Sequence, residues 1–265
     1  MNVVFLIPVY NAGKVLPSTF SFYYRLNPQP SKYIFLENNS TDDTVEKIKR
    51  FKRPYELIRA RFAKDAVKRL GNPYATIAIA RQILLTKTRY LNPDFAIYLD
   101  HDMFIKSRDL ITRLTEWNED IVGGMYLRIY PESIQIVNDQ TIITPLIASK
   151  WDDAKEGGKY ELRTHPPKSF LDYGEVAMTS GGCLCLSRKI IQDRRINFYP
   201  LPTELDPMAS EDYGYCLTAR RFGYRVYLDA SVDIHHHWDS NRKKPWAAKP
   251  GRWNETVREY EDFTF

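Results

Sequence analysis

The chain contains 265 residues, of which 43% are hydrophobic and 27% are charged. This length suits one large domain or two small ones, and the composition is typical of a folded globular protein and excludes a mainly disordered chain. Lys and Arg number 38 against 33 Asp and Glu, a net charge of +5. Such a mild excess favours phosphorylated ligands, anionic membranes or nucleic acid, without choosing among them.

The three cysteines, Cys183, Cys185 and Cys216, exclude a fully paired disulfide framework. The spacing of Cys183 and Cys185 is too short for a typical zinc site, so we expect buried free thiols. The first residues lack the basic segment of a signal peptide, and no apolar run reaches the roughly 18 residues of a membrane span. We therefore expect a cytoplasmic protein, either soluble or peripheral to the inner face of a membrane.

The first part of the chain alternates between expected strands and helices. The expected strands are 3–9, 33–36, 55–59 and 95–99, and the expected helices are 41–50, 74–89 and 109–117. Ser40 or Thr41 is the expected N-cap of the first of these helices, and Ser107 that of the third. This alternation predicts right-handed βαβ units and a parallel, doubly wound sheet over residues 1–125.

The second part is less regular. It contains expected strands at 121–129, 176–186, 224–227 and 232–236, and a helix at 210–222 that Gly223 ends. The proline-rich stretch 131–170 is predicted to form loops and short edge strands over a site. The tail after Trp238 is basic and poor in aliphatic residues.

Polar residues follow the expected strands of the first part. Asn11 follows the first strand, Glu37 to Ser40 close the second, and Asp100 and Asp102 follow the fourth. Ligands of doubly wound sheets bind at the carboxyl ends of the strands, which is where these residues are expected to lie.

Two acidic motifs are candidates for chemistry. Asp100-His101-Asp102 can hold a hard divalent cation, although a solvated turn is the alternative interpretation. In Ser210-Glu211-Asp212, carboxylates in the first turn of a helix are stabilised by its dipole. A carboxylate at that position can also remove a proton from an attacking hydroxyl.

Three consecutive histidines, His235, His236 and His237, fall on an expected strand. Because neighbouring side chains of a strand face opposite sides, one site can receive His236 alone or His235 together with His237. Imidazole is a good ligand for Mn²⁺ or Zn²⁺, and a solvated strand end is the alternative.

Arg81 and the pair Gly181-Gly182 are further candidates. Arg81 lies among apolar residues of an expected helix, so it must pair with a carboxylate or a phosphate, or extend to the surface. Consecutive glycines in an expected strand indicate the close approach of a ligand or another backbone, or a bulge.

The order of these motifs resembles that of the GT-A fold nucleotide-sugar glycosyltransferases, and most of all the family 2 type. The likeness extends from residue 3 to about residue 238, and it rests on Ile7-Pro8-Val9-Tyr10-Asn11, Glu37 to Thr44, Ala80-Arg81-Gln82, Tyr98 to Asp102, Gly181-Gly182, Ser210-Glu211-Asp212 and a late histidine. The stretch from Arg81 to Gly124 is also similar to mannan-polymerase-type mannosyltransferases.

The resemblance implies an α/β protein with one GT-A domain over 1–265. Its mostly parallel central sheet would be flanked by helices, with a smaller mixed subregion on the acceptor side. Residues 1–125 would form the nucleotide-binding half, 126–238 the acceptor-binding and catalytic half, and 239–265 a basic C-terminal tail.

The resemblance also implies roles for residues of the donor site. Pro8, Tyr10 and Asn11 would line the nucleotide pocket, and Arg81 would face the nucleotide or the diphosphate. Glu37 and Asn38 would read the base, at a position where the family usually has two aspartates. Gly181 and Gly182 would let the donor sugar pack closely.

The remaining implied roles concern the metal and the transfer step. Asp100 would lie near the ribose and the metal, Asp102 would hold the metal, Mn²⁺ or Mg²⁺, and His236 would complete its shell, with His235 the next choice. Asp212 matches the general base of inverting members, and Glu211 precedes it near the acceptor.

These implications predict an enzyme that moves a sugar from a UDP- or GDP-linked donor to a hydroxyl of a glycan, lipid-linked or protein acceptor. One alternative is a sugar-phosphate nucleotidyltransferase, but of the glycine-rich basic loop of that class only Gly13 and Lys14 are present. Another alternative is a non-catalytic module in which the basic tail, 242–253, binds nucleic acid or a membrane surface. We expect the tail to form a lid or a subunit contact, with peripheral membrane contact as a further option and no nucleic-acid partner.

Overall fold

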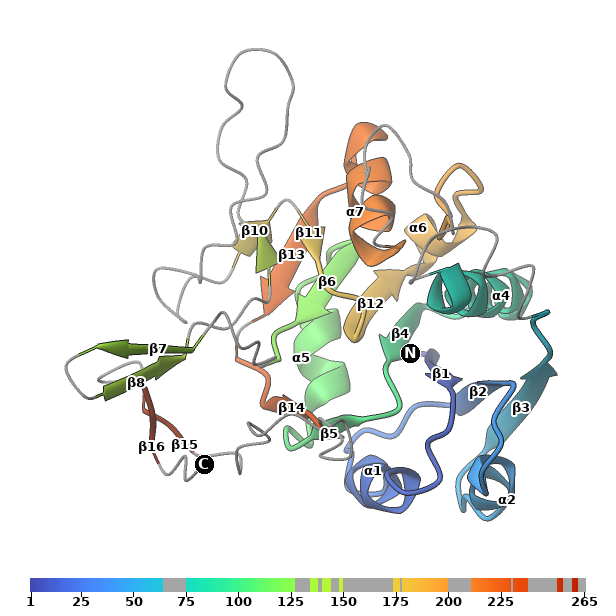
Figure 1. Ribbon diagram of the computed structural model, residues 1–265. Coiled ribbons are helices and arrows are strands. Elements are labelled where there is room, and N and C mark those ends of the chain that lie inside the picture. The colour runs from blue at the N-terminus through green and yellow to red at the C-terminus, as the bar shows by residue number, and fades with distance from the viewer. Residues whose placement is uncertain are drawn as a thin grey trace.

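The computed structural model describes residues 1–63, 75–126, 134–137, 140–143, 148–149, 174–176, 178–199, 211–229, 231–237, 252–254 and 259–261 (Figure 1). Its centre is an eight-stranded sheet with the order β10-β13-β6-β12-β4-β1-β2-β3. These strands are β1 (Val3–Val9), β2 (Lys32–Asn38), β3 (Tyr55–Ala60), β4 (Phe95–Leu99), β6 (Ile121–Gly124), β10 (Gly174–Val176), β12 (Cys183–Ser187) and β13 (Val226–Asp229).

The sheet has a parallel half and a mixed half. The strands β3, β2, β1 and β4 are mutually parallel. β12 runs antiparallel to both β4 and β6, β13 is parallel to β6, and β10 closes the edge antiparallel to β13. The expected doubly wound, mostly parallel GT-A-like sheet is thus confirmed, with β12 as its main inverted strand.

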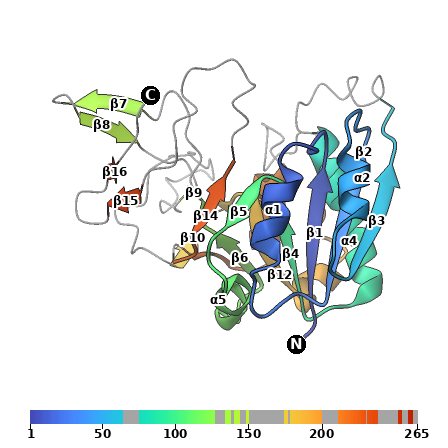
Figure 2. The same ribbon diagram turned by 90° about the horizontal axis from the view of Figure 1, so that it is seen from below.

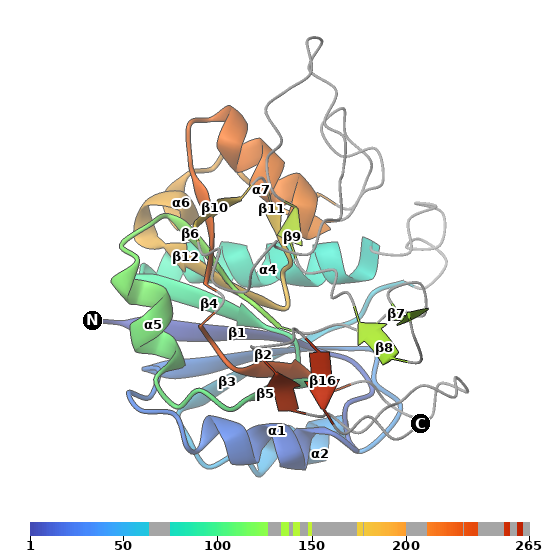
Figure 3. The ribbon, with the colours of Figure 1, turned by 90° about the vertical axis from the view of Figure 1, so that its left-hand side faces the viewer.

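The apolar sequence of β1 explains its central place. All seven of its residues are buried, and alternate side chains enter two separate cores. Helices α1 (Leu16–Tyr23), α2 (Thr44–Lys49) and α5 (Leu110–Glu116) cover one face of the sheet, while α4 (Ala75–Leu91), α6 (Arg188–Gln192) and α7 (Glu211–Arg221) cover the other (Figure 3). A strand covered on both faces has no solvent side, so its sequence is apolar throughout.

Short antiparallel pairs surround the sheet. β5 (Met103–Ile105) pairs with β14 (Ile234–His236), and Figure 2 shows the two side by side next to α1. The other pairs are β9 (Ala148–Ser149) with β11 (Met178–Thr179), β7 (Ile134–Val137) with β8 (Gln140–Ile143), and β15 (Arg252–Asn254) with β16 (Glu259–Glu261). Short strands were expected within 131–170, most of which lies outside the described residues, as does most of the tail 239–265.

Several expected boundaries were wrong for identifiable reasons. The single strand expected at 176–186 is divided, because the chain turns at Gly181-Gly182 before β12. α2 begins at Thr44, because the Asp42 carboxylate accepts a hydrogen bond from the Thr44 amide at 3.1 Å. Neither Ser40 nor Thr41 is its N-cap.

Two further capping expectations had different outcomes. The hydroxyl of Ser107 accepts from the Asp233 amide at 2.7 Å, so Ser107 joins two loops and Asp109 is the N-cap residue of α5. Gly223 does follow α7, as expected, and its φ of +84° is one that glycine adopts without strain. The helix α1, the short helix α6 and the strand β5 were not anticipated.

Two findings concern the cysteines and the apolar content of the helices. All three cysteines are buried and unpaired. Among the helices that the structure describes, none combines the length and the apolar character that crossing a membrane would need.

Candidate active site

The expected site residues converge at the edge where the parallel strands end. Asp100 directly follows β4, and its amide donates to the Gly182 carbonyl at 3.1 Å. The Met103 amide donates back to the Asp100 carbonyl at 3.1 Å, which turns the chain sharply through His101 and Asp102. This turn places two carboxylates beside the loop that precedes β12.

Asp100, Asp102 and His236 form a cluster with metal-ligand chemistry. One ligand atom from each lies within 4.8 Å of the others. The pairing of β5 with β14 sets His236 opposite Met103, and the His236 Nε2 lies 3.2 Å from the Asp102 Oδ1. Burial raises the pKa of Asp102, but the hydrogen bond and charge of His236 outweigh burial and lower this pKa to about 2. Two carboxylates and an imidazole are a suitable donor set for Mn²⁺ or Mg²⁺.

The other two histidines of the triplet face different partners. The His235 Nε2 lies 2.9 Å from the Asp233 Oδ1, and the His237 ring stacks on Phe104 with centroids 4.8 Å apart. The alternation of side chains along β14 thus brings His236 to the two aspartates. The structure therefore places His236 beside the two aspartates and directs His235, the second choice for the metal ligand, to Asp233.

Arg81 bridges two carboxylates inside the protein. Its side chain is only 3% exposed; its Nη2 donates to the Asp100 Oδ1 at 2.8 Å, and its Nη1 donates to the Glu211 Oε1. Burial lowers the pKa of Arg81, but the charges of Asp100, Glu211 and Asp212 outweigh burial and raise this pKa above its usual value. The sequence allowed a carboxylate or a phosphate as the partner of Arg81, and in the structure its partners are two carboxylates.

Glu211 has an unusual protonation equilibrium. Burial, together with the charge of the neighbouring Asp212, raises the pKa of Glu211 to about 8 despite the opposing charge of Arg81. Three carboxylates, those of Asp100, Glu211 and Asp212, surround one guanidinium. Because one positive charge cannot balance three negative ones, this cluster favours the uptake of a proton or of a cation.

Asp212 lies in the first turn of α7, against the loop before β12. Its Oδ2 accepts from the Gly181 amide at 2.8 Å and from the Ser180 hydroxyl at 3.3 Å, and its Oδ1 accepts from the Tyr213 amide at 2.9 Å. Ser180 is in turn hydrogen-bonded to the Tyr126 hydroxyl. Tyr126 was missed by sequence reasoning, since a single tyrosine after a strand carries no distinguishing signal.

The two expected glycines lie against protein side chains. A Cβ on Gly181 would overlap the Arg81 guanidinium, and one on Gly182 would overlap Tyr126 and Met103. The sequence indicated the close approach of a ligand or another backbone, whereas in the structure side chains of this same site make the approach.

The residues expected to hold the nucleotide lie at the ends of β1 and β2. Pro8 is buried within β1, while Tyr10 is 48% exposed. The side-chain oxygen of Asn11 accepts a hydrogen bond from the backbone amide of Thr41 at 2.8 Å. The backbone amide of Asn11 donates to the Ser40 hydroxyl at 3.0 Å. These contacts join the two strand ends into one rim.

Glu37 and Asn38 are both buried at the end of β2. The Glu37 carboxylate accepts from the Ser40 amide at 2.7 Å and from the Arg59 Nε at 3.3 Å, so both of its oxygens have protein partners. Because strand neighbours face opposite sides, Asn38 faces the side of the sheet that α4 covers, together with Leu36.

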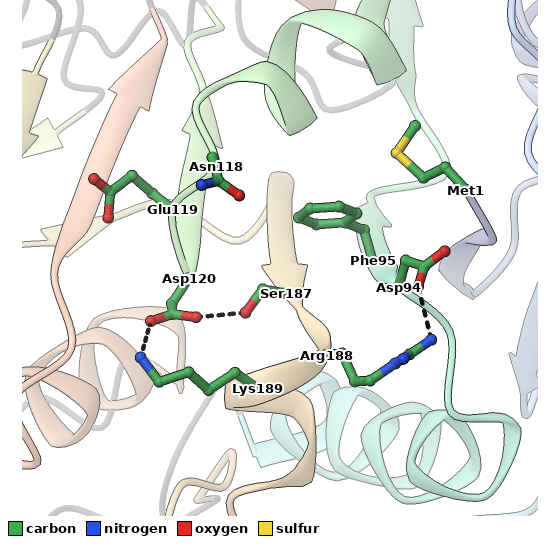
Figure 4. Close-up of a pocket in the computed structure, with 9 residues that line it drawn as sticks. All are labelled: Met1, Asp94, Phe95, Asn118, Glu119, Asp120, Ser187, Arg188 and Lys189. Carbon is green, nitrogen blue, oxygen red and sulfur yellow. Dashed lines mark hydrogen bonds and ion pairs between the residues drawn. The ribbon is translucent and has the colours of Figure 1, made fainter.

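A separate hollow of about 500 Å³ lies at the opposite end of the sheet, where β4 and β6 begin (Figure 4). Its charged groups are already paired: Arg188 donates to Asp94 at 2.7 Å and Lys189 to Asp120 at 2.8 Å. It is remote from the carboxyl ends of the parallel strands, and none of the expected site residues lines it.

Comparison with solved structures shows the same fold in known glycosyltransferases. Residues 1–349 of TarS from S. aureus match with a TM-score of 0.54 and 15% identity, over 89% of this chain and 60% of that one. The mannosyltransferase PcManGT from Pyrobaculum calidifontis, in complex with GDP-Man and Mn²⁺, matches with a TM-score of 0.50 and 14% identity, over 88% and 56%. GalNAc-T7 with UDP, GalNAc and Mn²⁺ matches with a TM-score of 0.56 and 13% identity, over 90% and 44%.

The chain therefore spans 60% or less of the length of these three proteins. A comparison with curated protein sequences finds no match. The model of the family described as glycosyl transferase family 2 matches residues 4–195, which include β1 to β4, the Asp100-His101-Asp102 turn and the glycine pair. This match, which covers more than half of the chain, shows that the chain belongs to glycosyltransferase family 2.

Proposed function

We propose that this enzyme transfers a sugar from a UDP- or GDP-linked donor to an acceptor hydroxyl, with a divalent cation, Mn²⁺ or Mg²⁺, held by Asp100, Asp102 and His236. The observation that carries the proposal is the convergence of these three ligands within 4.8 Å at the carboxyl edge of the sheet. Support comes from structures of the same fold: TarS has been solved with UDP-GlcNAc, and PcManGT with GDP-Man and Mn²⁺.

The chemistry of the donor set fits such a cation. Hard oxygen ligands come from the two aspartates, and a borderline nitrogen ligand comes from His236, a combination that Mn²⁺ accepts readily. When bound, the cation would act as a Lewis acid that neutralises the charge of the departing nucleoside diphosphate.

We assign the general base to Asp212. An acceptor hydroxyl is a weak nucleophile near pH 7, and a positioned carboxylate increases its reactivity by taking its proton. Hydrogen bonds from the Gly181 amide and the Ser180 hydroxyl hold the Asp212 carboxylate in place, whereas the neighbouring Glu211 is bound by Arg81. This assignment applies to a transfer that inverts the anomeric configuration, with Glu211 as a support of the site on the acceptor side.

The nucleotide is assigned to the rim at the ends of β1 and β2. Tyr10 and Asn11 are exposed at this rim, whereas Pro8 is buried in β1. Asn38 and Glu37 are the candidates for reading the base. In this proposal 1–125 form the nucleotide-binding half and 126–238 the catalytic half. Gly181 and Gly182 lie next to the proposed position of the donor sugar. Arg81 lies next to the proposed position of the diphosphate, where it donates a hydrogen bond to Asp100.

A thermal-shift panel tests the donor and the cation together. UDP, GDP, CDP and ADP are each added with and without Mn²⁺, because a ligand of the folded state raises the melting temperature. We expect UDP or GDP to raise it only when Mn²⁺ is present. A panel without any shift would contradict the proposed donor site, and a shift that ignores Mn²⁺ would contradict the role of the cation.

Matched variants test whether the thermal shift that requires Mn²⁺ arises at the proposed cation site. Asp102→Asn should remove the shift that requires Mn²⁺, while Asp94→Asn should keep it, because Asp94 lies in an ion pair at the opposite end of the sheet. Asp212→Asn should keep the nucleotide shift and lose transfer. Equal loss in Asp102→Asn and Asp94→Asn would show that the effect is not specific to the site.

A further inference from the structure

Tyr126 and Ser180 form a hydrogen-bonded chain that ends on Asp212. Tyr126 lies two residues past the end of β6, and Ser180 precedes the glycine pair, so residues distant in the sequence meet at one carboxylate. We infer that Tyr126 and Ser180 are positioning residues, which orient the Asp212 carboxylate toward the acceptor. This inference rests on the proposed role of Asp212 as the general base.

The hydrogen bonds of this chain have only one possible direction. A carboxylate only accepts, so the Ser180 hydroxyl must donate its one proton to the Asp212 Oδ2, 3.3 Å away. The Ser180 oxygen is then the acceptor for Tyr126, whose hydroxyl must be the donor. The phenol of Tyr126 therefore determines which way the Ser180 hydroxyl points.

This orientation acts on a single oxygen of Asp212. The Oδ2 receives the Ser180 hydroxyl and also the Gly181 amide, at 2.8 Å. Two donors from one loop, one of them rigid backbone, hold this carboxylate in a single rotamer. A general base must meet the acceptor proton within hydrogen-bond distance, so a fixed rotamer contributes directly to the rate of transfer.

Tyr126 also contacts the proposed cation site, but through a different part of its side chain. Its ring lies 5.8 Å from the His236 ring, centroid to centroid, and its hydroxyl lies over Gly182. The ring thus supports the metal ligand, and the hydroxyl supports the base. Tyr126→Phe removes the second contact and keeps the first, which makes the two roles separable.

Simple burial does not explain the bond between Tyr126 and Ser180. Tyr23 and Tyr215 are fully buried as well, yet their hydroxyls have no hydrogen-bond partner in the described part of the chain. This fold therefore accommodates a buried phenol without a partner. At Tyr126 the partner is present, and it leads to the one carboxylate assigned as the base.

The experiment compares Tyr126→Phe, Ser180→Ala and the double variant by steady-state release of nucleoside diphosphate from UDP-GlcNAc or GDP-mannose, whichever matches the nucleotide of the thermal-shift panel. We expect kcat to fall about tenfold in Ser180→Ala, which loses a hydrogen bond to a charged group, and about fivefold in Tyr126→Phe, which loses one to a neutral hydroxyl. The Kd for the nucleotide with Mn²⁺ should stay within about twofold of the wild type. The double variant should lose no more than Ser180→Ala alone, because both substitutions act on the same chain of bonds.

Two controls complete the design. Tyr33→Phe removes a buried phenol that donates to Gln29 at 3.0 Å, away from the site, and should leave kcat unchanged. Ser180→Thr keeps a hydroxyl at the same position and should recover much of the activity that Ser180→Ala loses.

The outcomes separate this inference from the proposed function. If Asp212→Asn is inactive while Tyr126→Phe and Ser180→Ala keep the wild-type kcat, the base stands and the positioning role is wrong. If Asp212→Asn keeps its activity, the proposed base is wrong and the inference fails with it. A double variant whose losses multiply, or single variants that lose nucleotide binding as much as kcat, would also overturn the inference.

Discussion

The two sides of the proposed site are built differently. On the β4 side, Asp100 and Asp102 lie two residues apart, directly after a buried strand, so local sequence is enough to bring them together. On the side of α7 and β14, Glu211 lies 130 residues from its partner Arg81, and His236 reaches Asp102 only through the pairing of β5 with β14. Half of the site is therefore local, and half depends on the completed fold.

Arg81 is the residue that joins the two sides, and replacing it should have the largest effect. Arg81→Leu leaves the buried Glu211 and the partly buried Asp100 without their shared cation, and we expect a loss of about 3–5 kcal/mol in the free energy of unfolding. Arg81→Lys should restore only part of it, because one ammonium cannot reproduce the planar fork that spans two carboxylates.

Urea denaturation measures this loss. Arg188→Leu is the matched control, since it breaks an ion pair with Asp94 whose side chains are 50% and 37% exposed, and it should cost about 1 kcal/mol or less. Similar losses in both variants would show that the buried ion pairs of Arg81 contribute no more to stability than an exposed ion pair does.

Replacing Gly181, which lies against the Arg81 guanidinium, should have the next largest effect. Gly181→Ala forces a methyl group against the guanidinium, and we expect a loss of about 1–3 kcal/mol. In the background of Arg81→Ala the same substitution should cost far less, because the overlapping group is gone. A double-mutant cycle by urea denaturation checks this, and additive losses would contradict the proposed clash.

The histidines allow a smaller but more specific test of the α7 and β14 side. His236→Ala should weaken Mn²⁺ binding by roughly tenfold or more, measured by calorimetry with the wild type as reference. His235→Ala is the matched control, because His235 pairs with Asp233 instead of the two aspartates. A larger effect in His235→Ala would mean that the other face of β14 supplies the ligand.

The last test concerns a dependence of stability on pH. The folded-state pKa of Glu211 is raised from its usual 4.5 to about 8, so the folded protein binds this proton more tightly than the unfolded chain does. The stability from this group is complete below about pH 4.5 and is lost as the pH rises toward 8. Without divalent cations, Glu211→Gln should remove this decline between pH 5 and 8, as measured by urea denaturation at each pH. An unchanged slope would assign the decline to other groups.

Sequence reasoning succeeded where a feature is local. The apolar run of β1 was predicted with its observed limits, and so was β4, because strands buried on both faces have uninterrupted apolar sequences. It failed where a side chain from another segment decides a boundary. Ser107 bonds to the distant Asp233 instead of capping α5. The start of α2 is an exception, because Asp42, which sets it, lies only two residues before Thr44.

The candidate site shows the same division. The sequence indicated that Arg81 needs an anionic partner, but it could not choose between a carboxylate and a phosphate, since the partners come from β4 and α7. It indicated that Gly181 and Gly182 allow a close approach, but not that Arg81 and Tyr126 make it. No local pattern distinguishes Tyr126 from the other tyrosines of the chain.

The sequence by itself determined the parallel half of the sheet, the position of the acidic turn after β4, and the resemblance to glycosyltransferase family 2. These follow from short-range periodicity and from the order of motifs along the chain. Only the tertiary structure decided which histidine meets the two aspartates, which carboxylates share Arg81, and which hydroxyls hold Asp212. These pairings join residues separated by 19 positions for Arg81 and Asp100 and by 134 positions for Asp102 and His236. Only the packing of strands and helices brings them within hydrogen-bond distance.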